Sequence, residues 1–189
     1  NGNLTSEMEY VAQKEGICKN KVLKNVANGS LVILKNNTRK DVIPTAVGNG
    51  VSVKINANIG TSLERSSLNE ELDKVKIIET TGADVLMDLS TGADIDDVRR
   101  KIIASTKLPI GTVPIYQAGK EALDEFRDIS KLSKDKFFSD IEKQCKDGVD
   151  FITVHCGVTK FVVEQLEKQG RICDIVSRGG SMLACWIKT

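Results

Sequence analysis

The larger part of this sequence alternates between short apolar runs and amphipathic helical patterns. Five runs rich in β-branched or aromatic residues predict strands at residues 53–57, 84–89, 110–115, 151–154 and 172–176. Helical patterns with apolar residues three or four positions apart lie between them. This alternation predicts right-handed βαβ units around a parallel sheet. The sheet is either open and doubly wound, or part of a (β/α)8 barrel, which needs eight strands to close.

The first fifty residues follow a different pattern and predict a small helical arm. Ser6 and Glu9 match the capping box that opens a helix, and a second helical pattern follows. Residues 35–50 lack a periodic pattern and contain proline and glycine, so they predict a loop. We therefore divide the chain into an N-terminal helical arm at residues 1–50 and an α/β region at residues 51–189.

The charge and hydropathy of the chain exclude several kinds of partner. Its 27 basic and 26 acidic residues nearly cancel, which gives no reason to expect nucleic acid or an anionic membrane surface. No apolar run approaches the roughly 20 residues of a membrane span. No two of the five cysteines form a C-x-x-C motif, and the single histidine completes no zinc-ligand cluster. We expect a cytoplasmic protein with mostly buried, unreactive cysteines and no metal on this chain.

Polar residues follow the predicted strands, beside glycines or other small residues. Examples are Asn58, Tyr116, His155 and Arg178. The carboxyl ends of parallel strands meet at one rim, where ligands bind in such folds. Arg178 supplies a planar donor fork that suits phosphate or carboxylate. The sequence therefore predicts a polar pocket for a small anionic ligand.

Each of these residues also has a simpler interpretation. Asn58 can be a turn residue, His155 a buried core histidine and Arg178 a solvated loop charge. Met87 is more often a core residue than a ligand contact, and its neighbour Asp88 points to the opposite face of a regular strand. No nucleophile–base pair can be read from the sequence, so the residues alone name no reaction.

Five longer motifs, in a fixed order, resemble one enzyme family. They are KINANIG at residues 54–60, MDLSTG at 87–92, GTVPIYQ at 111–117, GVDFITVHCG at 148–157 and IVSRGGS at 175–181. Over nearly its whole length the sequence resembles the phosphomethylpyrimidine synthase family of thiamine biosynthesis. The resemblance implies a radical S-adenosylmethionine lyase that converts 5-aminoimidazole ribotide into 4-amino-5-hydroxymethyl-2-methylpyrimidine phosphate.

The resemblance also implies a fold and a substrate site. The family's catalytic domain is a (β/α)8 barrel, so we expect a partial barrel of about five parallel strands after the N-terminal arm. The family is dimeric, which leads us to expect a homodimer. By position, the family's substrate contacts fall on Asn58, Met87, Tyr116, His155, Ser177, Arg178 and Gly179.

The sequence departs from the family in its cofactor motifs. The full-length family uses S-adenosylmethionine, a 4Fe-4S cluster and zinc or iron, bound through motifs that lie further downstream and are not in these 189 residues. We therefore expect a truncated piece that binds no cofactor and is inactive alone. Three alternatives stay open: a piece of the related 5-hydroxybenzimidazole synthase of cobamide synthesis, a non-catalytic ribonucleotide-binding module, and an unrelated barrel lyase acting through His155.

Overall fold

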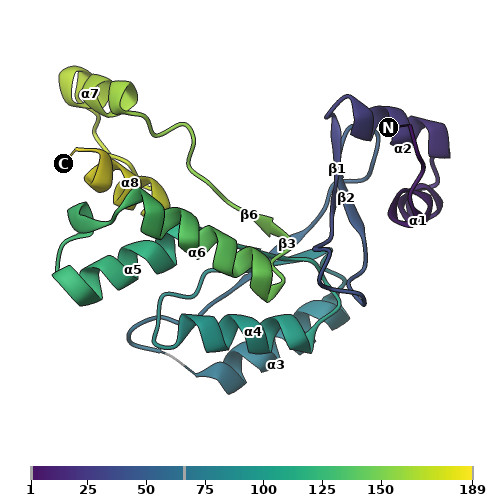
Figure 1. Ribbon diagram of the computed structural model, residues 1–189, viewed down its shortest axis with the longest axis horizontal. Helices are drawn as coiled ribbons and strands as arrows, with labels where there is room; N and C mark the ends of the chain where they lie inside the picture. Colours follow the sequence, from purple (N-terminus) through teal and green to yellow (C-terminus); the bar gives the residue numbers. More distant parts are fainter. Residues whose placement is uncertain (1, 66, 189) are drawn as a thin grey trace.

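Four parallel strands form the main sheet of the structure, a computed structural model that describes residues 2–65 and 67–188 (Figure 1). They lie side by side in sequence order: β3 (Asn56–Ile59), β4 (Val85–Asp88), β5 (Ile110–Thr112) and β6 (Phe151–Ile152). All three pairings are parallel. The predicted parallel α/β architecture is confirmed for these four strands.

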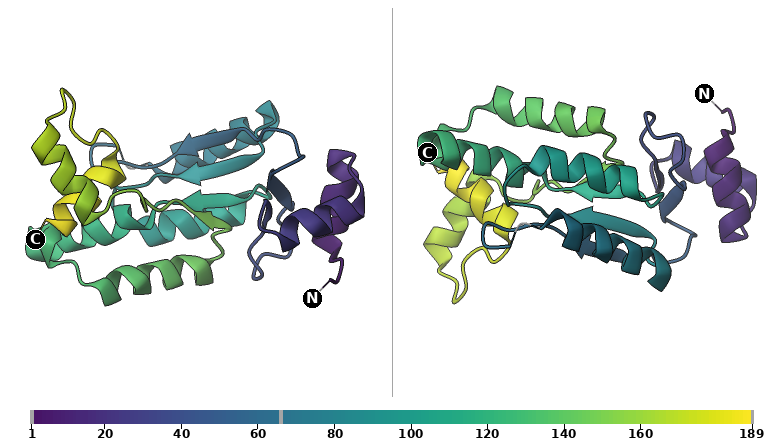
Figure 2. Two further views of the ribbon diagram at one scale, coloured as in Figure 1. Left: turned by 90° about the horizontal axis from the view of Figure 1, so that it is seen from above. Right: turned by 90° about the horizontal axis from the view of Figure 1, so that it is seen from below.

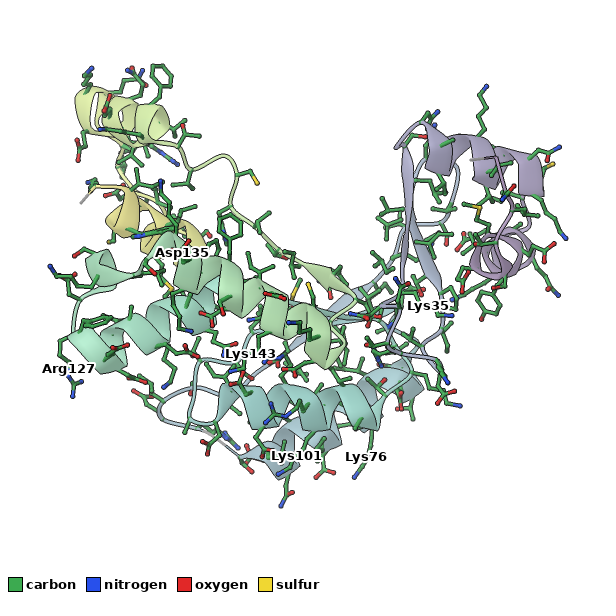
Figure 3. The ribbon with its side chains drawn as sticks, in the orientation of Figure 1. Lys35, Lys76, Lys101, Arg127, Asp135 and Lys143 are labelled. Carbon is green, nitrogen blue, oxygen red and sulfur yellow. The ribbon has the colours of Figure 1, made fainter. Side chains whose placement is uncertain are left out.

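Helices connect the successive strands and also follow the last one. The connecting elements are α3 (Leu68–Thr81), α4 (Ile95–Ser105), α5 (Pro114–Phe126), the 3-10 turn η1 (Ile129–Lys131) and α6 (Lys134–Asp147), whereas α7 (Lys160–Gln169) and α8 (Arg178–Ile187) come after β6. The charged ends of Lys76 on α3 and Lys101 on α4 lie on the outer side of these helices (Figure 3). Across the described residues, no helix combines the length and apolar character that a membrane crossing needs.

The main core lies between one face of the sheet and helices α3 and α4. It contains Ile59, Val75, Ile78, Leu86, Val98, Ile102 and Ile110. Each fully buried aliphatic side chain of this kind contributes about 1.5–3 kcal/mol to folding. Residues three and four positions apart on each helix supply this core, which is why the helical periodicity could be read from the sequence.

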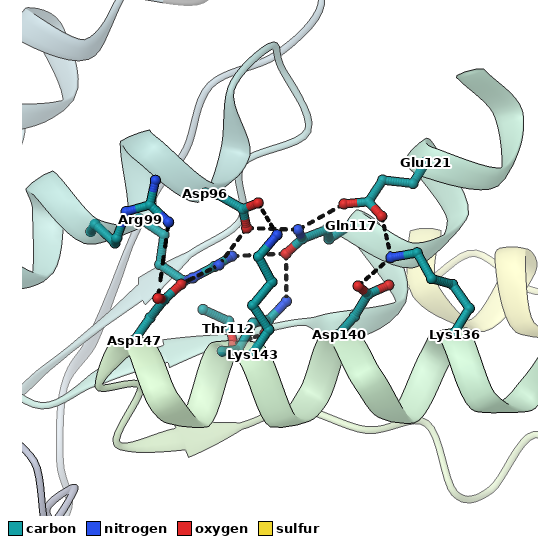
Figure 4. Close-up of polar contacts among 11 residues, drawn as sticks. Asp96, Arg99, Thr112, Gln117, Glu121, Lys136, Asp140, Lys143 and Asp147 are labelled. Carbon is teal, nitrogen blue, oxygen red and sulfur yellow. Dashed lines mark hydrogen bonds and ion pairs between the residues drawn. The ribbon is translucent and has the colours of Figure 1, made fainter. Parts of the chain in front are cut away.

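A buried polar network on the same face joins α4, α5 and α6 (Figure 4). Arg99 is 1% exposed and donates to carboxylates of α4 and α6 and to the amide oxygen of Gln117 on α5. Gln144 on α6 donates to that same oxygen and accepts a hydrogen bond from Thr112 on β5. Because buried polar groups are costly when unpaired, these matched bonds fix the three helices against the sheet.

The N-terminal arm contains two helices and a hairpin. They are α1 (Ser6–Glu15), α2 (Lys19–Ala27), β1 (Leu31–Leu34) and β2 (Thr45–Gly48). The predicted N-cap, Ser6, was wrong by one position. Thr5 is the N-cap of α1, and its hydroxyl oxygen accepts a hydrogen bond from the Met8 N–H at 3.3 Å. The loop predicted at residues 35–50 was wrong in part, because β2 pairs antiparallel with β1. Both views of Figure 2 show the arm at one end of the strands and α7 and α8 at the other.

The loop between β1 and β2 fastens the arm to the amino ends of the parallel strands. The fully buried carboxylate of Asp150 accepts hydrogen bonds from the backbone N–H groups of Asn36 at 2.7 Å and Ile110 at 2.8 Å, and it pairs with Arg39. Arg39 also donates to the carbonyl oxygen of Thr106, just after α4, at 2.7 Å. The carboxylate of Asp150, the residue directly before β6, thus joins the amino end of that strand to the arm and to β5.

Three strand predictions in the α/β region need correction. The strand predicted at residues 110–115 ends at Thr112, because α5 begins at Pro114. The fifth strand, predicted at residues 172–176, is wrong: Ile172 and Val176 are exposed and belong to the loop between α7 and α8. A strand forms only when a neighbour pairs with it, and β6 offers just two residues. The strand predicted at residues 53–57 begins later, at Asn56, because Val53 is 94% exposed and contacts no core.

The prediction of buried cysteines was also wrong. All five are exposed: Cys18, Cys145, Cys156, Cys173 and Cys185. They lie at a helix N-cap, on outward helix faces and in loops. Free cysteines are usually buried, but no other element in the described structure covers these positions.

We expect Arg39→Met to destabilise the chain by about 3–5 kcal/mol, because it leaves the buried Asp150 carboxylate without its cationic partner. Arg65→Met is the matched control, since Arg65 pairs with Glu70 at the surface. Urea unfolding of the two variants and the parent measures the difference. Equal midpoints for both variants would contradict this role of Asp150.

Candidate ligand-binding site

An open cleft lies at the carboxyl ends of β3 and β4, beside the first turns of α5 and α8. Its volume is about 420 Å³, and it is lined by Asn58, Ile59, Gly60, Thr61, Ser62, Lys74, Leu89, Tyr116 and Arg178. Three of the residues singled out from the sequence, Asn58, Tyr116 and Arg178, therefore come together from three separate elements. Asn58 lies within β3 and Tyr116 within α5, rather than after a strand as the sequence predicted.

Tyr116 and Arg178 form a stacked pair in this cleft. Tyr116 lies in the first turn of α5, which begins at Pro114, and Arg178 is the first residue of α8. The guanidinium carbon of Arg178 lies 5.2 Å from the centre of the Tyr116 ring, within cation–π range. In the part of the chain that the structure describes, Arg178 has no hydrogen-bond or ion-pair partner. Its donor fork is therefore free to bind an anionic ligand while the ring holds its orientation.

The other predicted site residues adjoin the cleft without lining it. His155 lies against Gly179, where an added Cβ would be 2.1 Å from the imidazole Cε1, so glycine is required there. The imidazole lines a neighbouring apolar hollow of about 290 Å³. Met87 is 7% exposed and packs in a second core cluster. Ser177 caps α8, accepting a hydrogen bond from the Gly180 N–H at 3.1 Å.

The turn after β3 depends on residues that sequence reasoning missed. The carboxylate of Glu71 on α3 is buried and accepts a hydrogen bond from the Gly60 N–H at 2.8 Å. A Cβ on Gly60 would lie 2.7 Å from the Leu89 backbone, so glycine allows the two turns to meet. The Thr61 N–H donates to Ser90 Oγ at 3.1 Å. The available signal was an acidic residue on the inward, apolar face of a helix, which is rarely buried without a partner.

Asp88 stabilises the turn that follows β4. Its Oδ1 accepts a hydrogen bond from the Ser90 N–H at 2.9 Å and another from the Ser90 hydroxyl at 2.5 Å. The side chain faces away from Met87, as expected for a strand, and is 5% exposed. Burial raises the pKa of the Asp88 carboxyl above its ordinary value, although the two bonds from Ser90 act to lower it.

The raised pKa of Asp88 predicts a pH dependence. The folded state holds this proton more tightly than the unfolded chain, so ionisation of Asp88 removes stability as the pH rises above about 4, the ordinary aspartate pKa. Asp88→Asn keeps an Oδ1 acceptor for both Ser90 bonds and carries no charge. We expect its free energy of unfolding to rise relative to the parent between pH 4 and pH 8. Urea unfolding across this range measures the difference, and a difference constant with pH would contradict the prediction.

The described residues do not fit an iron–sulfur cluster or a zinc or iron ion. Within residues 2–65 and 67–188, no three His, Cys, Asp or Glu side chains are grouped so that they can hold a metal ion. The five cysteines lie on separate elements, whereas a cluster needs several thiolates converging on it.

The fold and the cleft define a class: a parallel α/β protein with an open cleft, lined by Lys74 and Arg178, at the carboxyl ends of its strands. Comparison with known proteins gives the family. A family model described as "Radical SAM ThiC family" matches residues 1–189, and the chain belongs to this family.

Curated relatives named phosphomethylpyrimidine synthase are similar over nearly the whole chain. The protein of Pyrococcus abyssi is 51% identical over 186 residues, which cover 98% of this chain and 43% of that protein. A relative from Dehalococcoides mccartyi strain CBDB1 is 48% identical with the same coverage. The protein of Methanocaldococcus jannaschii is 48% identical over 187 residues, 99% of this chain and 44% of that protein. The chain therefore spans less than half the length of these relatives.

Proposed function

We propose that this chain forms the ribotide-binding part of a phosphomethylpyrimidine synthase. The whole enzyme converts 5-aminoimidazole ribotide into 4-amino-5-hydroxymethyl-2-methylpyrimidine phosphate for thiamine. The observation that carries the proposal is similarity to enzymes of that name along 98% of the chain. Neither 5-hydroxybenzimidazole synthase nor a non-catalytic module is favoured, because the relatives described above are all named phosphomethylpyrimidine synthase.

The chemistry of the cleft supports a ribotide ligand. A ribotide carries a phosphate monoester, ribose hydroxyls and a flat base. Arg178 offers a planar fork to the phosphate, and the Asn58 amide offers both a donor and an acceptor to hydroxyls. We also assign substrate contacts to Met87, Tyr116, His155, Ser177 and Gly179. In this proposal these groups bind and orient the ribotide and exclude water from one side of it.

The sheet topology supports a partial (β/α)8 barrel at residues 51–189, after an arm at residues 1–50. The four strands follow one another in sequence order, without the reversal that marks a doubly wound sheet. Helices α3, α4 and α6 contact the same face, as right-handed crossovers between consecutive barrel strands require.

The cofactors of the whole enzyme belong to the proposal as well. Membership of the radical S-adenosylmethionine family implies S-adenosylmethionine and a 4Fe-4S cluster in the full-length protein, and the resemblance adds zinc or iron. These groups require ligands beyond the residues described here, since the latter provide no converging set. We further propose a cytoplasmic location.

We expect Arg178→Met to weaken the binding of 5-aminoimidazole ribotide to this chain. The loss of a charge-assisted hydrogen bond costs about 1.5–3 kcal/mol, roughly tenfold to a hundredfold in Kd. Arg171→Met is the matched control, since Arg171 is exposed and lines a different hollow, between α7 and α8. Isothermal titration calorimetry measures both. A parent chain that does not bind the ribotide would refute the proposed function, and equal affinities for both variants would remove Arg178 from the site.

We also propose that the chain assembles as a homodimer. Strands β3 and β6 each have one neighbour in the described sheet, so each leaves an open edge that can recruit another chain. Most homo-oligomers are two-fold dimers. We expect light scattering to give a dimeric mass, with an interface that includes β3, β6 or the N-terminal arm. A monomeric mass at tens of micromolar protein would refute this expectation.

A further inference from the structure

Lys74 on α3 lines the same cleft as Asn58, Tyr116 and Arg178, and nothing above assigns it a role. We propose that Lys74 is a further ligand-binding residue, which contacts the phosphate group of the bound ribotide. Glu71 acts as its positioning residue. The inference rests on the proposed function for the identity of the ligand, but the anion site itself stands on the geometry of α3 and the turn after β3.

Glu71 ties Lys74 to the wall of the cleft. Its side chain is 4% exposed, and its two carboxylate oxygens accept separate hydrogen bonds, from the Gly60 N–H at 2.8 Å and from Lys74 Nζ at 2.7 Å. Burial of a carboxylate is costly unless its oxygens are hydrogen-bonded or paired with a cation, and here both oxygens have a donor. The Lys74 side chain is 47% exposed, and an ammonium group has three donors. Two donors of Lys74 therefore remain for a ligand.

The lining of the cleft favours an anion. Among the described residues that line it, the charged ones are both cationic, Lys74 from α3 and Arg178 from α8, and none carries a carboxylate. The adjoining Thr61 is 2% exposed, and its Oγ1 has no hydrogen-bond partner in the described structure. Buried hydroxyl groups are normally satisfied by protein, water or a bound group. Two cations from α3 and α8, together with an unpaired hydroxyl in the turn after β3, match the charge and the acceptor oxygens of a phosphate monoester.

A second lysine on the same helix shows what distinguishes Lys74. Lys76 also pairs with a carboxylate three residues earlier, Asp73, at 2.7 Å. Both partners of that pair are exposed, at 75% and 69%, and Lys76 lies on the outer side of α3 (Figure 3). The two pairs share spacing and chemistry, and they differ in the burial of the acid and in access to the cleft. Lys76 is therefore the matched control for Lys74.

The test compares Lys74→Gln, Lys74→Arg and Lys76→Gln with the parent. Glutamine removes the charge and keeps a donor for Glu71, and thermal unfolding checks that each variant folds. The probes are 5-aminoimidazole ribotide, its dephosphorylated riboside and inorganic phosphate, titrated by calorimetry and by amide NMR at Gly60 and Thr61. We expect Lys74→Gln to lose roughly tenfold in ribotide affinity, the size of one charge-assisted hydrogen bond. Lys74→Arg restores most of it, Lys76→Gln matches the parent, and riboside binding is unchanged.

The three probes separate this inference from the proposed function. If the parent binds phosphate at the turn but does not bind the ribotide, the proposed function fails, and loss of the phosphate response in Lys74→Gln still supports the anion site. If Lys74→Gln binds ribotide and phosphate as the parent does, the role of Lys74 is overturned while the proposed function stands. If Lys74→Gln loses as much affinity for the riboside as for the ribotide, the phosphate contact of Lys74 is also overturned. If Lys74→Gln does not fold, amide NMR of the parent decides: phosphate must shift the Gly60 and Thr61 resonances, and unmoved resonances would overturn the anion site. A parent that binds none of the probes refutes both.

Discussion

The buried carboxylate of Asp150 is the interaction on which the arrangement of this chain depends. It accepts donors from the arm, through Asn36 and Arg39, and from the first residue of β5, while it directly precedes β6. A carboxylate removed from water must keep such donors, so the arm and the amino ends of the strands hold one another in register. The amino end of the sheet is closed in this way, and the opposite end carries the cleft.

A second set of buried polar bonds sets the position of the cleft's aromatic wall. Gln117 is 2% exposed and bonded to Arg99 and Gln144, so the first turn of α5 is fixed to α4 and α6. Tyr116, the preceding residue, is oriented by that turn and stacks under Arg178 of α8. Structural polar groups on the helix side of the sheet therefore control the geometry of the groups that line the cleft. This separation between a supporting layer and a binding rim is usual in parallel α/β proteins.

The candidate site was only partly readable from the sequence. Asn58, Tyr116 and Arg178 were chosen for their place near strand ends, and the structure brings them into one cleft. Glu71 and Lys74 were missed, because an acid–base pair on a helix usually is a solvated surface pair. Only the fold reveals that this acid is buried under the turn after β3 and that its partner faces the cleft.

The sequence by itself determined the local elements. Helix periodicity, hydroxyl caps such as Ser67 and glycine ends such as Gly82 depend on residues within a turn or two of each other. Tertiary structure decided what needs distant partners: the pairing of β2, the absence of a strand at residues 172–176, and the exposure of the cysteines. A strand is stable only beside another strand, and a side chain is buried only beneath another element. Neither condition can be read from a single segment.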